Sequence, residues 1–123
     1  MTSTLPASHL PSLNEHKLSA LETAIGSEQL HNLLEMLAQE ARTRPTIVMK
    51  LLEMGSLLAA SLEAHALKGA AFGMCADRLG EAARAVEEIT SADQGPELAR
   101  LLVDAADATL LALDKRRKRK GFA

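Results

Sequence analysis

The 123 residues of the chain fit one domain, 47% of them are hydrophobic, and the single cysteine, Cys75, excludes an internal disulfide. The formal net charge is −2, and no apolar run approaches the roughly 20 residues of a membrane span, which excludes a transmembrane segment. Ala and Leu dominate while two Phe are the only Phe, Trp or Tyr residues, so the composition excludes a strand-rich fold and predicts an all-α one.

Residues 1–13 contain Ser, Thr and Pro and are predicted to form a flexible leader. They lack the charged start and the apolar segment of a secretory signal, and the start of the chain favours a free-standing protein, which we expect to be cytoplasmic with Cys75 buried. A short first helix is predicted from Asn14, as its N-cap, to Ile25, and Gly26 ends it.

The second predicted helix has Ser27 as its N-cap, and its apolar residues follow helical spacing as far as Ala41. Pro45 has no N–H to donate and its ring clashes with the preceding turn, so we expect it to break or kink this helix near Arg44. The helix then continues to the sequence MGS at 54–56.

Ser56 is the predicted N-cap of a third helix, and a turn near 73–76 leads to a fourth that ends near Thr90. The sequence SADQGP at 91–96 predicts a loop, with Pro96 suited to the first helical position of a last helix. The apolar positions expected to face the core are Leu57, Ala60, Ala64, Leu67, Ala71 and Met74 in the third helix, Leu79, Ala82, Ala83, Val86 and Ile89 in the fourth, and Leu98, Leu101, Leu102, Ala105, Ala112 and Leu113 in the last.

Four substantial helices joined by short connections predict an antiparallel four-helix bundle with an additional short N-terminal helix. We expect this bundle to span residues 14–114 and to be monomeric.

The basic run KRRKRK at 115–120 holds six of the 14 Lys and Arg residues, so residues 1–114 carry eight basic and 16 acidic residues, a local balance of −8. A basic tail over 115–123 could touch an anionic partner such as nucleic acid or a membrane. The alternative, which we favour, is a solvated helix end where cations suit the C-terminal dipole. No aromatic residues lie among the basic ones to stack on bases, so nucleic acid is not expected as the main partner.

One histidine of the third helix lies off its core stripe. His65 is one residue, about 100° of helical rotation, away from that stripe. It lies on a second line that also contains Leu58, Leu62, Gly69 and Phe72. Lys68 follows three residues on, so its side chain can meet that of His65 at the surface.

On spacing alone, the simpler interpretation of His65 is a half-exposed histidine without a functional role. Gly69, however, costs about 1 kcal/mol relative to Ala in a helix, which suggests that something approaches the backbone there.

The sequence AHALKGAA followed by DRLGEAARAVEE resembles the histidine-containing phosphotransfer (HPt) domain family. The core motif of that family is Ala-His-x-Leu-Lys-Gly, followed by small residues and a second helix that ends in an apolar–Glu or apolar–Gln pair. The matching positions are Ala64, His65, Leu67, Lys68 and Gly69, with Leu79 and the Val86–Glu87 pair at the spacing of the family. The resemblance covers roughly residues 14–113 and implies the same helix order.

The resemblance implies that His65 accepts a phosphoryl group on Nε2, that Lys68 stabilises its oxygens, and that Gly69 leaves room for the partner. It implies that Glu87 accepts a hydrogen bond from Nδ1–H of His65 and so orients the ring. The alternative for Glu87 is a carboxylate that faces solvent beside Glu88.

The implied function is a phosphorelay intermediate that exchanges the phosphoryl group with aspartates of response-regulator receiver domains or of a hybrid histidine kinase. Such a chain is a phosphocarrier rather than an enzyme and needs no cofactor, since Mg²⁺ is expected in the receiver. Its docking surface would comprise Leu58, Leu62, Gly69 and Phe72. The alternative is a helical interaction module that binds a receiver or regulator without phosphotransfer.

Three positions depart from the family pattern. Ala70 stands where Ser is common, and Cys75 replaces a usual glycine. Phe72 stands where small residues are usual, and it either fills a partner pocket or turns inward as core. No set of His, Cys, Asp or Glu residues has zinc-ligand spacing, so no metal site is expected.

Overall fold

The computed structural model describes residues 10–122, and all regular secondary structure in this range is helical. The elements are α1 (Glu15–Ile25), α2 (Ser27–Glu53), α3 (Leu57–Gly73), α4 (Asp77–Glu87), the short 3₁₀ helix η2 (Ala92–Gln94) and α5 (Gly95–Arg119). The prediction of an all-α fold is confirmed.

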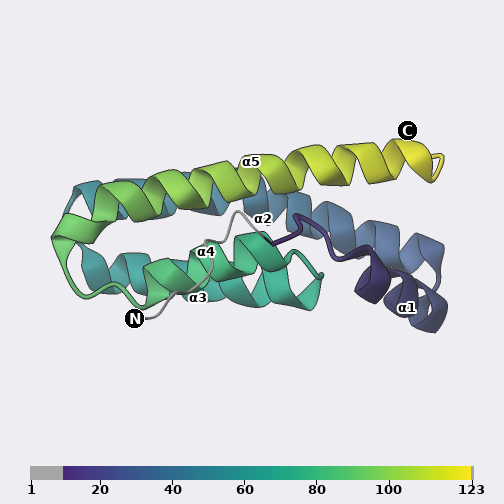
Figure 1. Cartoon of the computed structure of the whole chain (residues 1–123), viewed down its shortest axis with the longest axis horizontal. Helices are drawn as coiled ribbons and strands as arrows, with labels where there is room; N and C mark the ends of the chain where they lie inside the picture. The colour runs from purple at the N-terminus through teal and green to yellow at the C-terminus, as the bar shows by residue number, and fades with distance from the viewer. Residues whose placement is uncertain (1–9, 123) are drawn as a thin grey trace.

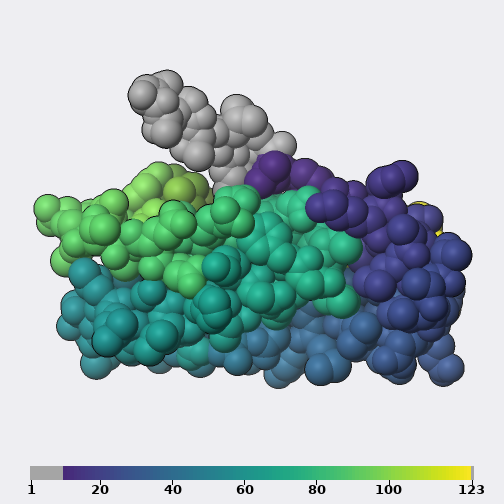
Figure 2. Space-filling model, turned by 90° about the horizontal axis from the view of Figure 1, so that it is seen from below, coloured from purple at the N-terminus to yellow at the C-terminus, as the bar shows by residue number. Residues whose placement is uncertain are grey.

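The five α-helices pack together around one core (Figure 1). The two longest, α2 and α5, lie side by side, and α3 and α4 pair with each other against them; α1 contacts α2. In Figure 2 the teal surface of α3 and α4 lies beside the blue surface of α2. None of the helices within residues 10–122 is long and apolar enough to cross a membrane.

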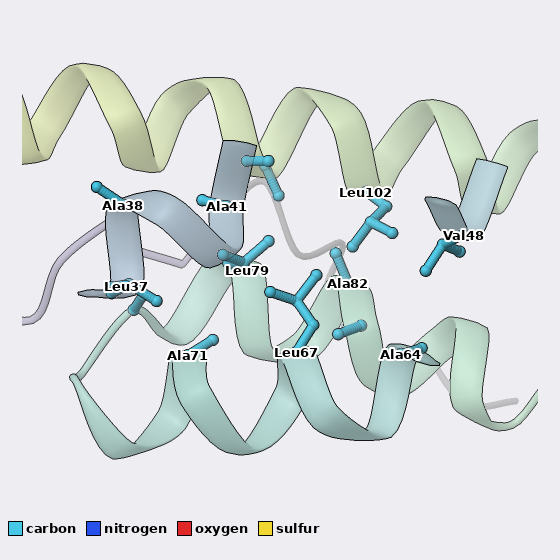
Figure 3. Packing of buried hydrophobic residues seen from close by; sticks show 14 of the residues in the cluster. Leu37, Ala38, Ala41, Val48, Ala64, Leu67, Ala71, Leu79, Ala82 and Leu102 are labelled. Carbon is cyan, nitrogen blue, oxygen red and sulfur yellow. The ribbon is translucent and has the colours of Figure 1, made fainter. Parts of the chain in front are cut away.

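The core is built mainly from Leu and Ala side chains (Figure 3). Leu67 of α3, Leu79 of α4 and Leu102 of α5 are fully buried and lie close together in the centre. Burial contributes roughly 1.5–3 kcal/mol for each such side chain. Most of the predicted core positions of the last three helices are buried, and six are partly buried, namely Leu57, Met74, Ile89, Leu98, Leu101 and Ala112.

The junction of α1 and α2 differs in part from the prediction. Asn14 is the N-cap of α1 as expected, and its side chain accepts a hydrogen bond from the N–H of Lys17 (3.1 Å). Ser27, however, is not a cap. Gly26 occupies that position at φ 93°, and Ser27 is the first helical residue, with its hydroxyl donating to Glu22 (2.7 Å). The prediction was wrong because Gly26 turns the chain from one helix into the next with no residue between them.

Pro45 does not break the second helix. α2 runs from Ser27 to Glu53 with Pro45 inside it. A proline inside a helix costs about 3 kcal/mol through a lost hydrogen bond and a steric clash. Ala41, Pro45 and Val48 are all buried on the face that meets the rest of the core. Burial of this face on both sides of the proline offsets that cost and keeps the helix whole.

The start of α3, the end of α4 and the connection that follows it differ in detail from the prediction. Ser56 is at the N-cap position of α3, but its side chain makes no capping hydrogen bond. α4 ends at Glu87 rather than near Thr90. The expected loop instead holds η2, where the side chain of Gln94 accepts a hydrogen bond from the N–H of Ser91 (3.0 Å) in a capping box.

Residues 1–9 of the predicted leader lie outside the described residues. Residues 10–13, the rest of the predicted leader, contact the folded helices. Leu13 is buried, and the carbonyl of Pro11 accepts a hydrogen bond from the N–H of Arg78 (3.2 Å). The N–H of Asn14 donates to the carbonyl of Cys75 (2.8 Å). These hydrogen bonds form because the segment covers the turn between α3 and α4.

The basic run is not a separate tail, because α5 continues to Arg119. Arg116 is only 5% exposed and forms ion pairs with Glu15 (3.6 Å) and Glu22 (3.8 Å) of α1. Arg119 also pairs with Glu15 (3.3 Å), and Lys120 pairs with Glu22 (3.3 Å). α5 therefore extends past the predicted boundary at 114, and acidic residues of the first helix meet its basic end.

Candidate functional site

The outer face of α3 is apolar. Among the 17 residues of this helix, only Glu63, His65 and Lys68 are ionisable. Leu58 is 74% exposed and Leu62 is 64% exposed, although helices usually turn large apolar side chains inward. The side chain of His65 is 65% exposed on the same helix. α3 therefore presents an imidazole to solvent within an apolar surface.

One carboxylate holds both His65 and Lys68. Glu87, the last residue of α4, places Oε2 at 2.5 Å from Nδ1 of His65. Its other oxygen, Oε1, lies 2.5 Å from Nζ of Lys68. The structure thus brings together the three residues that the family resemblance singles out, and Glu87 does not face solvent alone beside Glu88.

The hydrogen bonds from Lys68 and then from His65 hold the pKa of the Glu87 carboxyl below its ordinary value. An ionised carboxylate can only accept hydrogen bonds, so Nδ1 of His65 is the donor and carries the proton. Nε2 then holds the lone pair in the neutral ring. This nitrogen has no hydrogen-bond partner within residues 10–122. In the neutral ring, the site therefore presents an oriented Nε2 whose lone pair is free.

Ser61 also contacts Glu87, and the sequence analysis did not identify it as part of the site. Its hydroxyl donates to the backbone carbonyl of Glu87 (2.8 Å). Ser61 precedes His65 by four residues and Lys68 by seven, so the three side chains lie on one side of α3. That spacing was visible in the sequence. What it could not reveal is that α4 ends opposite this line.

No contact within the described residues requires a glycine at position 69. A Cβ atom built on it meets no heavy atom within 4 Å. Gly69 also lines a groove of about 310 Å³ between α2 and α3, together with Leu33, Met36 and Gly73. The surface beside His65 is therefore open to a close approach from outside.

Phe72 is turned toward α4. A Cβ atom built on Gly80 of α4 would lie only 2.6 Å from Cε1 of this ring, so the ring fills the space above the glycine. The guanidinium carbon of Arg84 lies 5.4 Å from the ring centroid. Of the two roles considered for Phe72, this position favours inward packing over filling a pocket in a partner.

Cys75 is buried as expected, and burial raises the pKa of its thiol. Its φ of 64° lies in the left-handed region, which glycine adopts more readily than other residues. No group of three or more His, Cys, Asp or Glu residues that could hold a metal ion occurs in residues 10–122.

Comparisons of the chain with protein-family models, with curated proteins and with solved structures found no match.

Proposed function

We propose that this protein is a phosphorelay intermediate of the HPt kind. It accepts a phosphoryl group on Nε2 of His65 from an aspartyl phosphate and passes it to an aspartate of another receiver domain. The observation that carries the proposal is the exposed His65 ring, with Nδ1 held by Glu87 and no hydrogen-bond partner for Nε2 within residues 10–122.

The proposal includes the matching architecture, in which α2, α3, α4 and α5 form an antiparallel four-helix bundle and α1 is an additional N-terminal helix. The contacts of α3 with α2 and α4, and of α5 with the same two helices, support this arrangement.

The transfer requires no proton movement by this chain. The lone pair on Nε2 attacks phosphorus, the N–P bond forms, and the bond from phosphorus to the aspartyl oxygen breaks with its electron pair. The proton stays on Nδ1, so the ring gains positive charge. The ionised carboxylate of Glu87 offsets this charge from 2.5 Å. The reverse sequence delivers the phosphoryl group to the next aspartate.

Lys68 supplies the second charge of the site. In the unphosphorylated protein its ammonium group pairs with Glu87 at 2.5 Å. The flexible side chain of Lys68 then turns toward the phosphoryl oxygens once they are bound to the neighbouring ring, where its charge stabilises them. We therefore assign Lys68 to electrostatic stabilisation.

The proposed partners are receiver domains or a hybrid histidine kinase, which supply the aspartate and its Mg²⁺. This chain is a phosphocarrier and not an enzyme. The exposed Leu58 and Leu62 and the open surface over Gly69 support docking at this face of α3. The apolar outer face of α3 also favours a second candidate, a helical interaction module that binds a receiver or regulator by shape alone.

Phosphoryl transfer from a panel of phosphorylated receivers tests the proposal, with His65→Gln as the comparison. We expect acid-labile, base-stable phosphate on the wild type and none on His65→Gln. Tight receiver binding by both proteins without any phosphate on the wild type would instead establish the interaction module.

A further inference from the structure

Three side chains of α3 converge on one residue of α4. His65 and Lys68 bind the carboxylate of Glu87, and Ser61 binds its backbone carbonyl at 2.8 Å. The carboxylate contacts explain how Glu87 orients the ring. The carbonyl contact acts on the backbone that carries this carboxylate.

The carbonyl of Glu87 needs a partner because α4 ends there. The last four carbonyls of a helix have no intrahelical N–H to bind. In α4 the carbonyl of Arg84 accepts from the N–H of Glu88 (3.0 Å), and that of Val86 accepts from Ile89 (3.1 Å). The carbonyl of Glu87 accepts from Ser61, a residue of another helix.

Among the described residues, Ser61 is the one helical residue whose hydroxyl bonds a backbone carbonyl of another helix. Hydroxyls inside helices commonly bond the carbonyl four residues earlier. Thr23, Thr43 and Thr109 do so, at 3.1, 3.0 and 2.8 Å. Ser61 instead crosses to α4, so its hydrogen bond joins the two helices that carry the site.

We propose that Ser61 is a positioning residue for His65, which acts by fixing the last turn of α4 so that the Glu87 carboxylate stays at Nδ1. The inference rests on the proposed function, because the orientation of the ring matters for phosphoryl transfer. Without the hydroxyl, the end of α4 frays, the carboxylate leaves Nδ1 for part of the time, and the proton on the neutral ring distributes between both nitrogens.

Nitrogen-15 NMR of the His65 ring in the unphosphorylated full chain measures this distribution directly. The variants are Ser61→Ala, Glu87→Ala and Ser19→Ala. Ser19 is an exposed residue of α1 whose hydroxyl has no hydrogen-bond partner within residues 10–122, so it provides a matched loss of a hydroxyl. Because Ala favours helices more than Ser does, Ser61→Ala retains the fold.

We expect Nδ1–H in the wild type and in Ser19→Ala, and a shift of Ser61→Ala toward the mixture found in Glu87→Ala. We also expect phosphoryl transfer to Ser61→Ala to be slower by about tenfold, since small displacements of reacting groups are costly. Wild-type ring signals in Ser61→Ala would overturn the role of Ser61 and leave the proposed function intact. Failure of the wild type to accept phosphate would overturn the proposed function, whatever the ring signals show.

Discussion

Nδ1 of His65 and Oε2 of Glu87 lie 2.5 Å apart, although the residues are 22 positions apart in the chain and belong to different helices. The contact uses Nδ1 of an exposed ring and leaves Nε2 without a hydrogen-bond partner in residues 10–122. Orientation, tautomer and compensating charge for the proposed reaction therefore depend on the end of α4.

Glu87→Ala tests this dependence. Loss of the carboxylate removes both the acceptor for Nδ1–H and the charge that offsets the phosphorylated ring. We expect the rate of phosphoryl transfer to His65 to fall about 10- to 100-fold. Glu88→Ala is the control, since Glu88 is the exposed neighbour outside the contact. Equal rates for the two variants would contradict the role of Glu87.

The pKa of Glu87 gives the pH range of the contact. Its hydrogen bonds, first from Lys68 and then from His65, lower this pKa from an ordinary value of 4.5. A carboxyl with a lowered pKa in the folded state contributes stability above its unfolded pKa, and loses it as the pH falls through the folded pKa. The contact should therefore persist from neutral pH to below 4.5.

Carbon-13 NMR titration of the Glu87 carboxyl measures this pKa. We expect a midpoint below 4.5 in the wild type and a midpoint closer to 4.5 in Lys68→Ala, because Lys68 is the largest cause of the shift. A wild-type midpoint at or above 4.5 would show that the carboxylate is not held by these two residues in solution.

Leu62→Asp tests the docking face. Leu62 is 64% exposed, so a charge there leaves the core intact. A receiver that docks on α3 would have to bury this charge, and we expect the affinity to fall by about tenfold or more. Leu111→Asp is the matched control, because Leu111 is an exposed leucine on α5. Calorimetric titration with a receiver compares the two. Equal loss of affinity would refute docking on α3.

Gly80→Ala tests the packing of Phe72. A new Cβ atom at Gly80 would lie 2.6 Å from the ring, so the ring must move. We expect the free energy of unfolding to fall by about 1–3 kcal/mol, as for other overpacked sites. The added variant Phe72→Ala should remove most of the effect of Gly80→Ala. Gly73→Ala is the control, since a Cβ atom there meets nothing within 4 Å.

Urea unfolding of Arg116→Ala tests whether the basic run belongs to the fold. Arg116 is 5% exposed and faces Glu15 and Glu22 of α1. Its removal loses buried methylene groups and leaves both carboxylates without this partner, so we expect destabilisation by about 1–3 kcal/mol. Lys115→Ala, at an exposed position, should change the stability by less than about 0.5 kcal/mol. Similar effects for both variants would indicate a solvated helix end.

The sequence was sufficient to predict elements that follow from local rules. The N-cap at Asn14 and the buried stripe of α3 are confirmed, because caps and periodic apolar residues act within a few residues of chain. Ser27 was wrongly interpreted as a cap, because Gly26 takes the cap position. Of the two effects expected at Pro45, the break does not occur, because tertiary packing outweighs a local penalty.

Contacts between distant residues were not available from spacing. Lys120 and Glu22 are 98 positions apart, so no local pattern could show that α1 forms ion pairs with part of the basic run. The pairing of His65 with Glu87 was expected only from the family resemblance. The apolar periodicity of the two helices does not predict this contact. Ser61 was missed because its partner is a backbone carbonyl, which has no signature in a sequence.

The most direct test of the central claim is to locate the phosphoryl group on the ring. The full chain is phosphorylated by a phosphorylated receiver domain, and phosphorus–nitrogen coupling is measured by NMR on protein with nitrogen-15 in its histidine rings. The account predicts coupling to Nε2 of His65, with the proton retained on Nδ1. Coupling to Nδ1, or phosphate on any residue other than His65, would contradict it.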